Sequence, residues 1–297
     1  MTALSAPALT RRVASTIGVT SSAAALAMLA QIYAARVLGA VEYGYYSYAL
    51  AWVMTIATLA KLGLDTTALR VLPACAASHS WGAHRAFAQF SSRWVGAASV
   101  GLAGLMLLVV AALSGREQPM TTALLFAAPL VLLLAFVDMR LSWLQALRRN
   151  VEAQLAAGVA RPLLLIALLA GAAITGRRVT AALLIACTAC ILGMVLVALL
   201  SMSRRFWPER SRTAAPEYNA KAWWSIAIPL FAIAISQMLL ARADVLIVGS
   251  FLSPAAVGIY AVANQLATLV TFGISTTNSV TADRKSTRLN SSHVALS

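Results

Sequence analysis

The most regular feature of the chain is a series of long apolar runs separated by short polar breaks. An α-helix rises about 1.5 Å per residue, so about twenty apolar residues suffice to cross the hydrocarbon core of a bilayer. Eight runs approach or exceed this length, and each predicts a membrane-spanning helix. The predicted spans are Val13–Leu38, Tyr45–Asp65, Trp94–Ser114, Thr122–Ser142, Gly158–Thr175, Ala181–Met202, Trp224–Leu252 and Ala256–Thr276.

The composition is typical of an integral membrane protein. Of the 297 residues, 61% are hydrophobic and 11% are charged, and the mean hydropathy of +0.82 is well above that of soluble domains. The continuous Leu, Ala and Val stretches lack the alternation that is typical of membrane barrel strands. A helix also satisfies its own backbone hydrogen bonds within the hydrocarbon. The predicted fold class is therefore all-α, a polytopic membrane protein.

The basic residues that give the net charge of +14 lie between the spans and are not concentrated on one face of a soluble domain. We therefore do not expect nucleic acid as a partner. Basic residues concentrate in alternate connections, as the positive-inside rule describes, and this predicts a cytoplasmic N-terminus. Four basic residues would then face outward: Arg36, Arg116, Arg177 and Arg178. Thirteen would face the cytoplasm: Arg11, Arg12, Arg70, Arg85, Arg93, Arg148, Arg149, Arg161, Arg204, Arg205, Arg210, Arg212 and Lys221.

Two local features have alternative interpretations. The pair Arg11 and Arg12 before an apolar run would suit a signal peptide, but the run is long and further spans follow, so we expect a retained helix. Cys187 and Cys190 form a CxxC pair inside the sixth span, with no second pair and no histidine nearby. We interpret them as small packing residues.

The first long connection, from Thr66 to Arg93, is expected to lie as an amphipathic segment on the cytoplasmic leaflet. Its histidines, His79 and His84, have no carboxylate nearby and are expected in solvent. We therefore expect neither a metal site nor a cofactor.

The second long connection, residues 203–223, carries five basic residues and two prolines and is interpreted as a hinge-like cytoplasmic connector. The chain repeats across it at an offset of 214 positions: a helix ends, a short break follows, and Gly-x-Tyr-x-x-Ala opens the next helix at Gly44 and again at Gly258. Parallel repeats of six helices are an arrangement that transporters use to enclose a cavity. The predicted organisation is a first six-helix bundle at 1–202 and the start of a second bundle at 224–282.

The final stretch, DRKSTRLNSSHVALS, is abruptly polar and has no helical periodicity. It resembles a translated sequencing-adapter tail (KSTRLNSSH). We expect that residues 283–297 are not natural and that the true protein continues with further helices. The alternative is a disordered polar tail.

Two regions carry a family resemblance: ARVLGAVEYGYYSYALAW with KLGLDTTALRVLP, and IPLFAIAISQMLLARADVLIVGSFLSPAAVGIYAVANQLATLV. They resemble the first and seventh helix regions of polysaccharide-biosynthesis (Wzx-type) flippases of the multidrug/oligosaccharidyl-lipid/polysaccharide exporter superfamily. One departure is Lys61, which stands where relatives often carry an acidic residue before Leu-Gly-Leu.

The resemblance implies twelve or fourteen helices in two bundles, in the bacterial inner membrane. It implies a flippase that moves undecaprenyl-diphosphate-linked oligosaccharide by alternating access for surface polysaccharides such as the lipopolysaccharide O-antigen. The expected partners are this lipid-linked oligosaccharide, membrane lipid and, if transport is ion-coupled, H⁺ or Na⁺. The alternatives are a multidrug exporter of the same superfamily and a membrane glycosyltransferase or phosphatase, although the chain has no DxD and no nucleophile beside a base.

Charged groups inside a membrane are functional candidates, because placing them there costs a few kcal/mol. Arg36 and Arg242 are the leading contacts for the diphosphate, since a guanidinium binds phosphate oxygens with two parallel hydrogen bonds. A further candidate is the acidic residue Asp244. Lys61 and Asp65, four apart on one helical face, are a candidate gating pair or, alternatively, a helix-end pair that reaches the membrane interface. Gln31, Gln237, Asn264 and Gln265 could hydrogen-bond sugars or, alternatively, link neighbouring helices. Asp138 with Arg140 is interpreted as an interfacial pair, and the apolar repeat partner of Arg242 is Met28.

Overall fold

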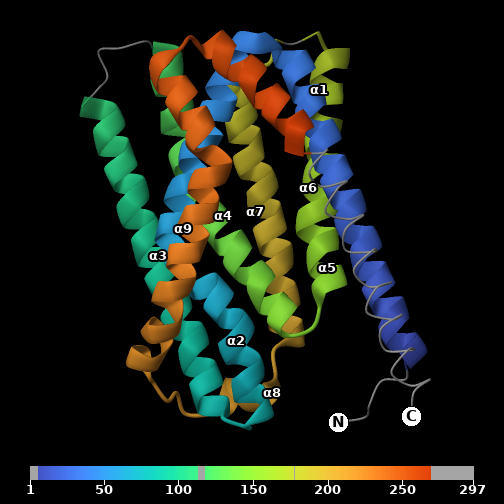
Figure 1. Cartoon of the computed structure of the whole chain (residues 1–297), viewed down its shortest axis with the longest axis vertical. Coiled ribbons are helices and arrows are strands. Elements are labelled where there is room, and N and C mark those ends of the chain that lie inside the picture. Colours follow the sequence, from blue (N-terminus) through green and yellow to red (C-terminus); the bar gives the residue numbers. More distant parts are fainter. Residues whose placement is uncertain (1–5, 113–117, 177, 269–297) are drawn as a thin grey trace, which may run out of the picture.

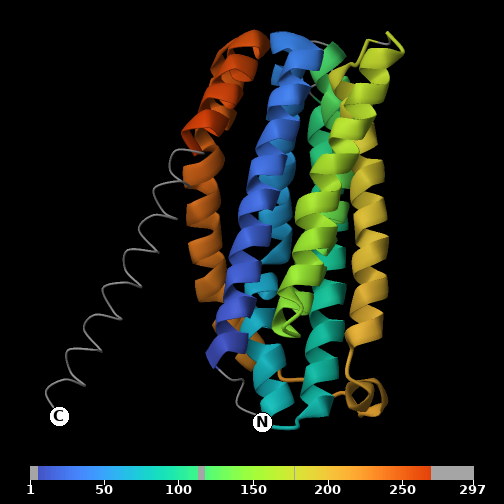
Figure 2. The same ribbon diagram turned by 90° about the vertical axis from the view of Figure 1, so that its right-hand side faces the viewer.

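The computed structural model describes residues 6–112, 118–176 and 178–268, and every regular element in these ranges is a helix. The long helices run up and down, side by side, in one bundle (Figures 1 and 2). Six of the described helical segments are long and apolar enough to cross a membrane. The predicted all-α polytopic membrane fold is confirmed.

The first helix, α1 (Ala6–Lys61), contains two of the predicted spans. Its backbone leaves the helical conformation at Gly39, where φ is 76°, a value that glycine adopts without a Cβ clash. The chain folds back there: the Tyr43 hydroxyl donates to Gln31 Oε1 at 3.2 Å, whereas the 12 positions between them would span about 18 Å of straight helix. The first two predicted spans are the two arms of α1.

The expectation for the first long connection is wrong. Its residues form α2 (Leu64–Ala77) and the start of α3 (Trp81–Ala112), and both helices pack against α4 (Gln118–Ala146). His79 is exposed as expected, but His84 is fully buried. The polar residues that suggested a loop lie on the same helices as small and aromatic residues. The face formed by the small and aromatic residues packs into the bundle.

The fourth, fifth and sixth spans are present. The fifth begins earlier than predicted, because α5 (Asn150–Gln154), the π-helical turn η1 (Leu155–Val159) and α6 (Ala160–Ile174) follow one another without a break. The sixth is α7 (Ala181–Phe206), whose first turn is capped by Thr180: its side chain accepts a hydrogen bond from the Leu183 amide at 3.4 Å.

The connector is fastened to α3. It contains the short helix α8 (Glu209–Thr213) and leads into α9 (Ala220–Phe251), the seventh span. An Arg85 guanidinium nitrogen donates to the Ala214 carbonyl at 2.9 Å, and the Tyr218 hydroxyl donates to Gln89 at 2.8 Å. Residues 254–268 are helical and begin the eighth predicted span. The rest of that span and the polar tail lie outside the described residues.

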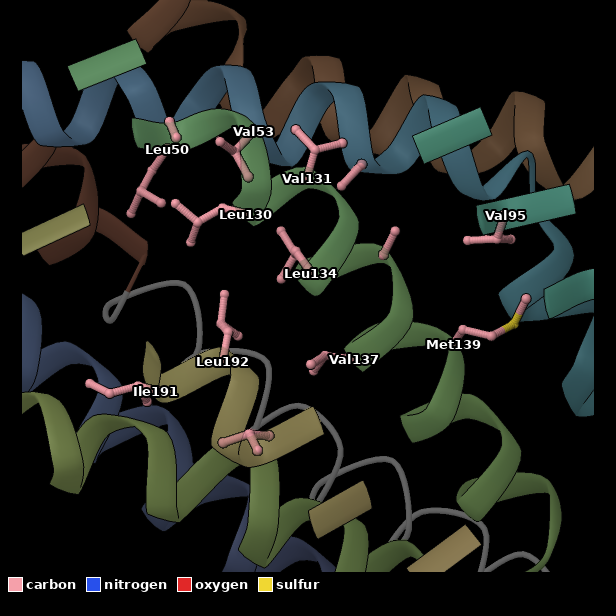
Figure 3. Close-up of a cluster of buried hydrophobic side chains, with 14 of the residues drawn as sticks. Leu50, Val53, Val95, Leu130, Val131, Leu134, Val137, Met139, Ile191 and Leu192 are labelled. Carbon is pink, nitrogen blue, oxygen red and sulfur yellow. The ribbon is translucent and has the colours of Figure 1, made fainter. Parts of the chain in front are cut away.

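The core is centred on α4, which contacts α1, α2, α3 and α7 (Figure 3). Leu130, Val131 and Met139 on α4 are fully buried, and side chains of α1, α3 and α7 surround them. In lipid, transfer from water does not drive helices together, so this interior gains its stability mainly from close van der Waals packing.

The two copies of the repeat touch at their glycines. A Cβ on Gly44 would overlap the carbonyl of Pro254, and a Cβ on Gly258 would overlap the carbonyl of Ala40. Each added Cβ would also lie 3.1 Å from the amide nitrogen of the other glycine. The contact is reciprocal under the 214-residue offset, as expected where a two-fold axis relates two equivalent segments.

Gly63, between α1 and α2, provides a test of the packing against α9. Its φ is +73°, and an added Cβ would lie 2.5 Å from the Ala227 carbonyl oxygen and 2.7 Å from the Phe231 amide nitrogen. Gly63→Ala should therefore lower the stability by about 1–3 kcal/mol, measured as a lower melting temperature of the purified protein in detergent. Gly101→Ala, at a helical glycine with nothing within 4 Å, is the matched control and should leave the melting temperature unchanged or slightly raised.

Candidate functional site

A cavity of about 730 Å³ lies between the first six predicted spans and the last two. Its walls come from both arms of α1, from the segment running from Gln154 into α6, from α7, from α9 and from residues 261–268. The cavity thus lies on the boundary between the two predicted repeats, where transporters built from parallel repeats hold their substrates.

Equivalent positions of the two repeats face this cavity. Five pairs of lining residues are separated by the repeat offset: Ala27 and Ala241, Gln31 and Val245, Ser47 and Ala261, Leu50 and Asn264, and Met54 and Thr268. Together with the contact between Gly44 and Gly258, these pairs place the approximate two-fold axis through the cavity.

The charge of the cavity wall is entirely positive. Arg161 on α6 and Arg242 on α9 line it, and none of the described residues that line it is Asp or Glu. Arg242 lies within electrostatic range of Tyr43, and Arg161 within range of Tyr46. Within the described part of the chain neither guanidinium forms an ion pair. Both are therefore available to an anionic ligand.

Four of the predicted site residues line the cavity together: Gln31, Arg242, Asn264 and Gln265. Arg161 was missed as a site residue, because it was assigned to a cytoplasmic connection although it lies inside the predicted fifth span. The described helix begins at Asn150, so Arg161 lies about 16 Å along it. An arginine within an apolar run was the signal that could have identified it.

Three of the seven predicted substrate-binding residues lie outside this cavity. Arg36 and Gln237 are exposed on the bundle surface and do not line it. Asp244 is also exposed, and its carboxylate accepts a hydrogen bond from the Tyr260 hydroxyl at 2.9 Å. Arg242 and Asp244 therefore point in different directions, as their spacing of two residues on a helix predicts.

The family of the chain follows from its similarity to known proteins. The polysaccharide biosynthesis protein family matches residues 9–282, which is most of the chain. The chain belongs to this family. No curated protein and no solved structure matches it. The match includes both regions of resemblance and ends before the polar tail that begins at Asp283.

A second charged cluster in this family member joins α1, α2 and α4. Lys61 Nζ lies 3.0 Å from an Asp65 carboxylate oxygen and 2.8 Å from an Asp138 carboxylate oxygen. The Lys61 side chain is only 12% exposed. Lys61 contacts Asp65 as predicted, but the two do not share one helix, because the backbone breaks at Leu62 and Gly63 between α1 and α2. Asp138 also binds Lys61, from α4, so it does not pair with Arg140, which lies over the Trp143 ring.

The described residues contain no group of three or more His, Cys, Asp or Glu side chains that could hold a metal ion. Cys187 and Cys190 are free thiols on α7. The chemistry that this site offers is hydrogen bonding and charge recognition, from guanidinium, amide and hydroxyl groups.

The Lys61 cluster predicts an asymmetry between two substitutions. Lys61→Met should destabilise the protein by about 3–5 kcal/mol, because it leaves two carboxylates facing each other without a cation. Asp138→Asn should cost less, because Lys61 keeps Asp65 as its partner. Thermal unfolding of both purified variants, monitored by the loss of the monodisperse fraction, measures the order. Equal melting temperatures for the two variants would show that water screens the charges of the Lys61 cluster and that its ion pairs add little stability.

Proposed function

We propose that this member of the family is a flippase for undecaprenyl-diphosphate-linked oligosaccharide in the bacterial inner membrane, serving the synthesis of surface polysaccharides such as O-antigen. The observation that best supports this function is the cavity at the repeat boundary. Its described lining residues include two arginines without an ion-pair partner and no carboxylate. A diphosphate is the anionic part of such a substrate, and two guanidinium groups can bind phosphate oxygens in a low-dielectric cavity. The amides of Gln31, Asn264 and Gln265 are suited to hydrogen-bond sugar hydroxyls.

The same observation weakens the alternative of a multidrug exporter. A cavity for cationic drugs would require acidic and aromatic groups. This cavity has two tyrosines, Tyr43 and Tyr46, but no acidic lining residue within the described part of the chain. We propose no catalytic activity, since the lining residues include no carboxylate, histidine or cysteine that could serve as a base or nucleophile.

The glycine contact supports alternating access between two bundles, residues 1–202 and the bundle that begins at 224. Tyr43 and Ser47, on either side of Gly44, line the cavity, so the contact of Gly44 with Gly258 lies at one end of it. This end carries the bend of α1 and is opposite the end with α8 (Figure 1). Separation of the two glycines would open the cavity there.

The distribution of basic residues supports an orientation with the α8 end in the cytoplasm. The end of α7 and the short helix α8 lie at this end (Figure 1), and they carry Arg204, Arg205, Arg210 and Arg212. The excess of basic residues on the cytoplasmic side remains when Arg161 is no longer counted there. The N-terminus is then also cytoplasmic.

The proposed roles of the arginines predict graded losses of transport. In a strain whose surface polysaccharide depends on this protein, Arg242→Ala and Arg161→Ala should each strongly reduce export at equal membrane abundance. Loss of one charge-assisted phosphate contact costs about 1.5–3 kcal/mol, or roughly ten- to a hundredfold in binding. Arg242→Lys should keep part of the activity, because it retains the charge and loses the planar fork.

The matched control is Arg36→Ala, which removes an exposed arginine outside the cavity and should leave export near the parental rate. Parental export by both cavity variants would refute the proposed diphosphate site.

The orientation predicts opposite locations for two reporter fusions. A reporter fused after Arg212, in α8, should be cytoplasmic, and one fused after Glu117, between α3 and α4, should be external. A phosphatase active only outside the cytoplasm, paired with a fluorescent protein that folds only inside, measures both. Reversed signals at both sites would invert the orientation.

The glycine contact predicts a change in access. In a variant lacking the native cysteines and carrying Ser47→Cys in the cavity, labelling by a membrane-impermeant maleimide from outside should be slow. Adding Gly258→Leu should accelerate it, because the side chain overlaps the carbonyl of Ala40 and separates the two segments. Adding Gly101→Leu instead, where there is open space, should leave the rate unchanged. Equal rates in all three would show that this contact does not close the cavity.

A further inference from the structure

Two adjoining cavities lie at the α8 end of the bundle and are separate from the 730 Å³ cavity between the repeats, which we refer to as the transport cavity. Their volumes are about 630 Å³ and 700 Å³, and they share Trp143, Arg204, Trp207 and Arg212. They share no lining residue with the transport cavity. Their walls come from α3, α4, the end of α7 and the connector, so we refer to them together as the connector pocket.

The connector pocket is strongly and uniformly positive. The described residues that line it include six arginines and no Asp or Glu; the arginines are Arg85, Arg93, Arg140, Arg204, Arg205 and Arg212. None of the six forms an ion pair with another described residue. Where their contacts are seen, the partners are uncharged: Arg85 and Arg212 donate to the backbone carbonyls of Ala214 and Arg204, and the Arg140 guanidinium lies 4.1 Å from the centre of the Trp143 ring.

Unpaired donors in the same pocket point to a missing acceptor. Trp143 Nε1, Ser203 Oγ and Arg140 Nε are buried and have no hydrogen-bond partner among the described residues. The Trp143 and Ser203 residues are only 4% and 3% exposed, and all three line the smaller cavity. Buried polar groups in folded proteins are rarely left unpaired. Two unpaired donors, on Trp143 and Ser203, and four arginines, one of them Arg140, suit a ligand that offers several acceptor oxygens.

We propose that the connector pocket is a binding site for a phosphate group, distinct from the transport site. Phosphate oxygens accept hydrogen bonds from guanidinium, indole N–H and hydroxyl groups, and the phosphate charge offsets that of the arginines. Leu200 and the two indoles add apolar walls. Basic pockets between helices at the cytoplasmic membrane boundary suit anionic phospholipid headgroups, and a soluble phosphate offers the same chemistry.

A bound phosphate would tie the connector to the first bundle. Arg212 lies on α8, whereas Arg140 lies on α4 and Arg204 on α7, and all three face the smaller cavity. A ligand that bridges them holds the connector, which leads directly into α9, against the end of α4. The site therefore offers a means by which an anionic lipid or a phosphate metabolite controls the position of the second bundle.

The test measures binding of two probes to the purified full chain: phosphatidylglycerol, counted by native mass spectrometry, and inorganic pyrophosphate, measured by calorimetry. The pocket variant is Arg140→Gln with Arg204→Gln. The matched control is Arg148→Gln with Arg210→Gln, which removes the same charge from exposed positions at the same end and outside the pocket. The pocket variant should weaken binding of at least one probe by about tenfold or more, and the control by less than about twofold.

Trp143→Phe provides a milder variant that retains the ring beneath Arg140 and removes only the indole N–H. It should weaken binding of the same probe about threefold to tenfold with an unchanged melting temperature. Selective loss of phosphatidylglycerol binding identifies a lipid site, and selective loss of pyrophosphate binding identifies a site for a soluble anion. If neither probe binds, or if pocket and control variants lose affinity equally, the arginines act only as a diffuse positive surface and the proposal fails.

Discussion

The hydrocarbon interior of a bilayer contains no water to solvate a charge or to pair with a free backbone amide, and this constraint governs both the fold and the chemistry of the chain. The backbone satisfies it with helices throughout the described residues. The charged side chains satisfy it in two different ways. Lys61 is neutralised by two carboxylates from neighbouring helices, whereas Arg161 and Arg242 face a cavity in which a ligand can take that role.

The charges thus fall into two groups, those paired within the protein and those that line a cavity without an ion-pair partner. The Lys61 cluster joins three helices of the first bundle through short ion pairs, and its cation and anions are both supplied by the protein. Among the described residues, the 730 Å³ cavity and the connector pocket present cations alone. A charge that lines a cavity without an ion-pair partner in the protein is the stronger indication of a binding site, because an anionic ligand can neutralise it there.

Close approach of the two repeats depends on residues without side chains. Gly44 and Gly258 bring the two equivalent segments together so tightly that a methyl group at either would overlap a backbone carbonyl. A contact of this kind has little polar or ionic attraction to break, which suits an interface that opens and closes. The bend at Gly39 has a related role, since it folds α1 back and brings Gln31 beside Tyr43 at the wall of the cavity.

The apolar runs by themselves determined the all-α membrane class and most of the spans, because the length and hydropathy of a membrane helix are local properties of the chain. Lys61 and Asp65 pair as their spacing predicted, although the helix breaks between them at Leu62 and Gly63 and places them on α1 and α2. Only the tertiary structure showed that Asp138 completes this cluster, that Arg161 joins Arg242 while Arg36 does not, and that His84 is buried. These relations depend on the rotation and register of each helix against its neighbours. Packing between residues far apart in the chain sets both, and no local pattern records them.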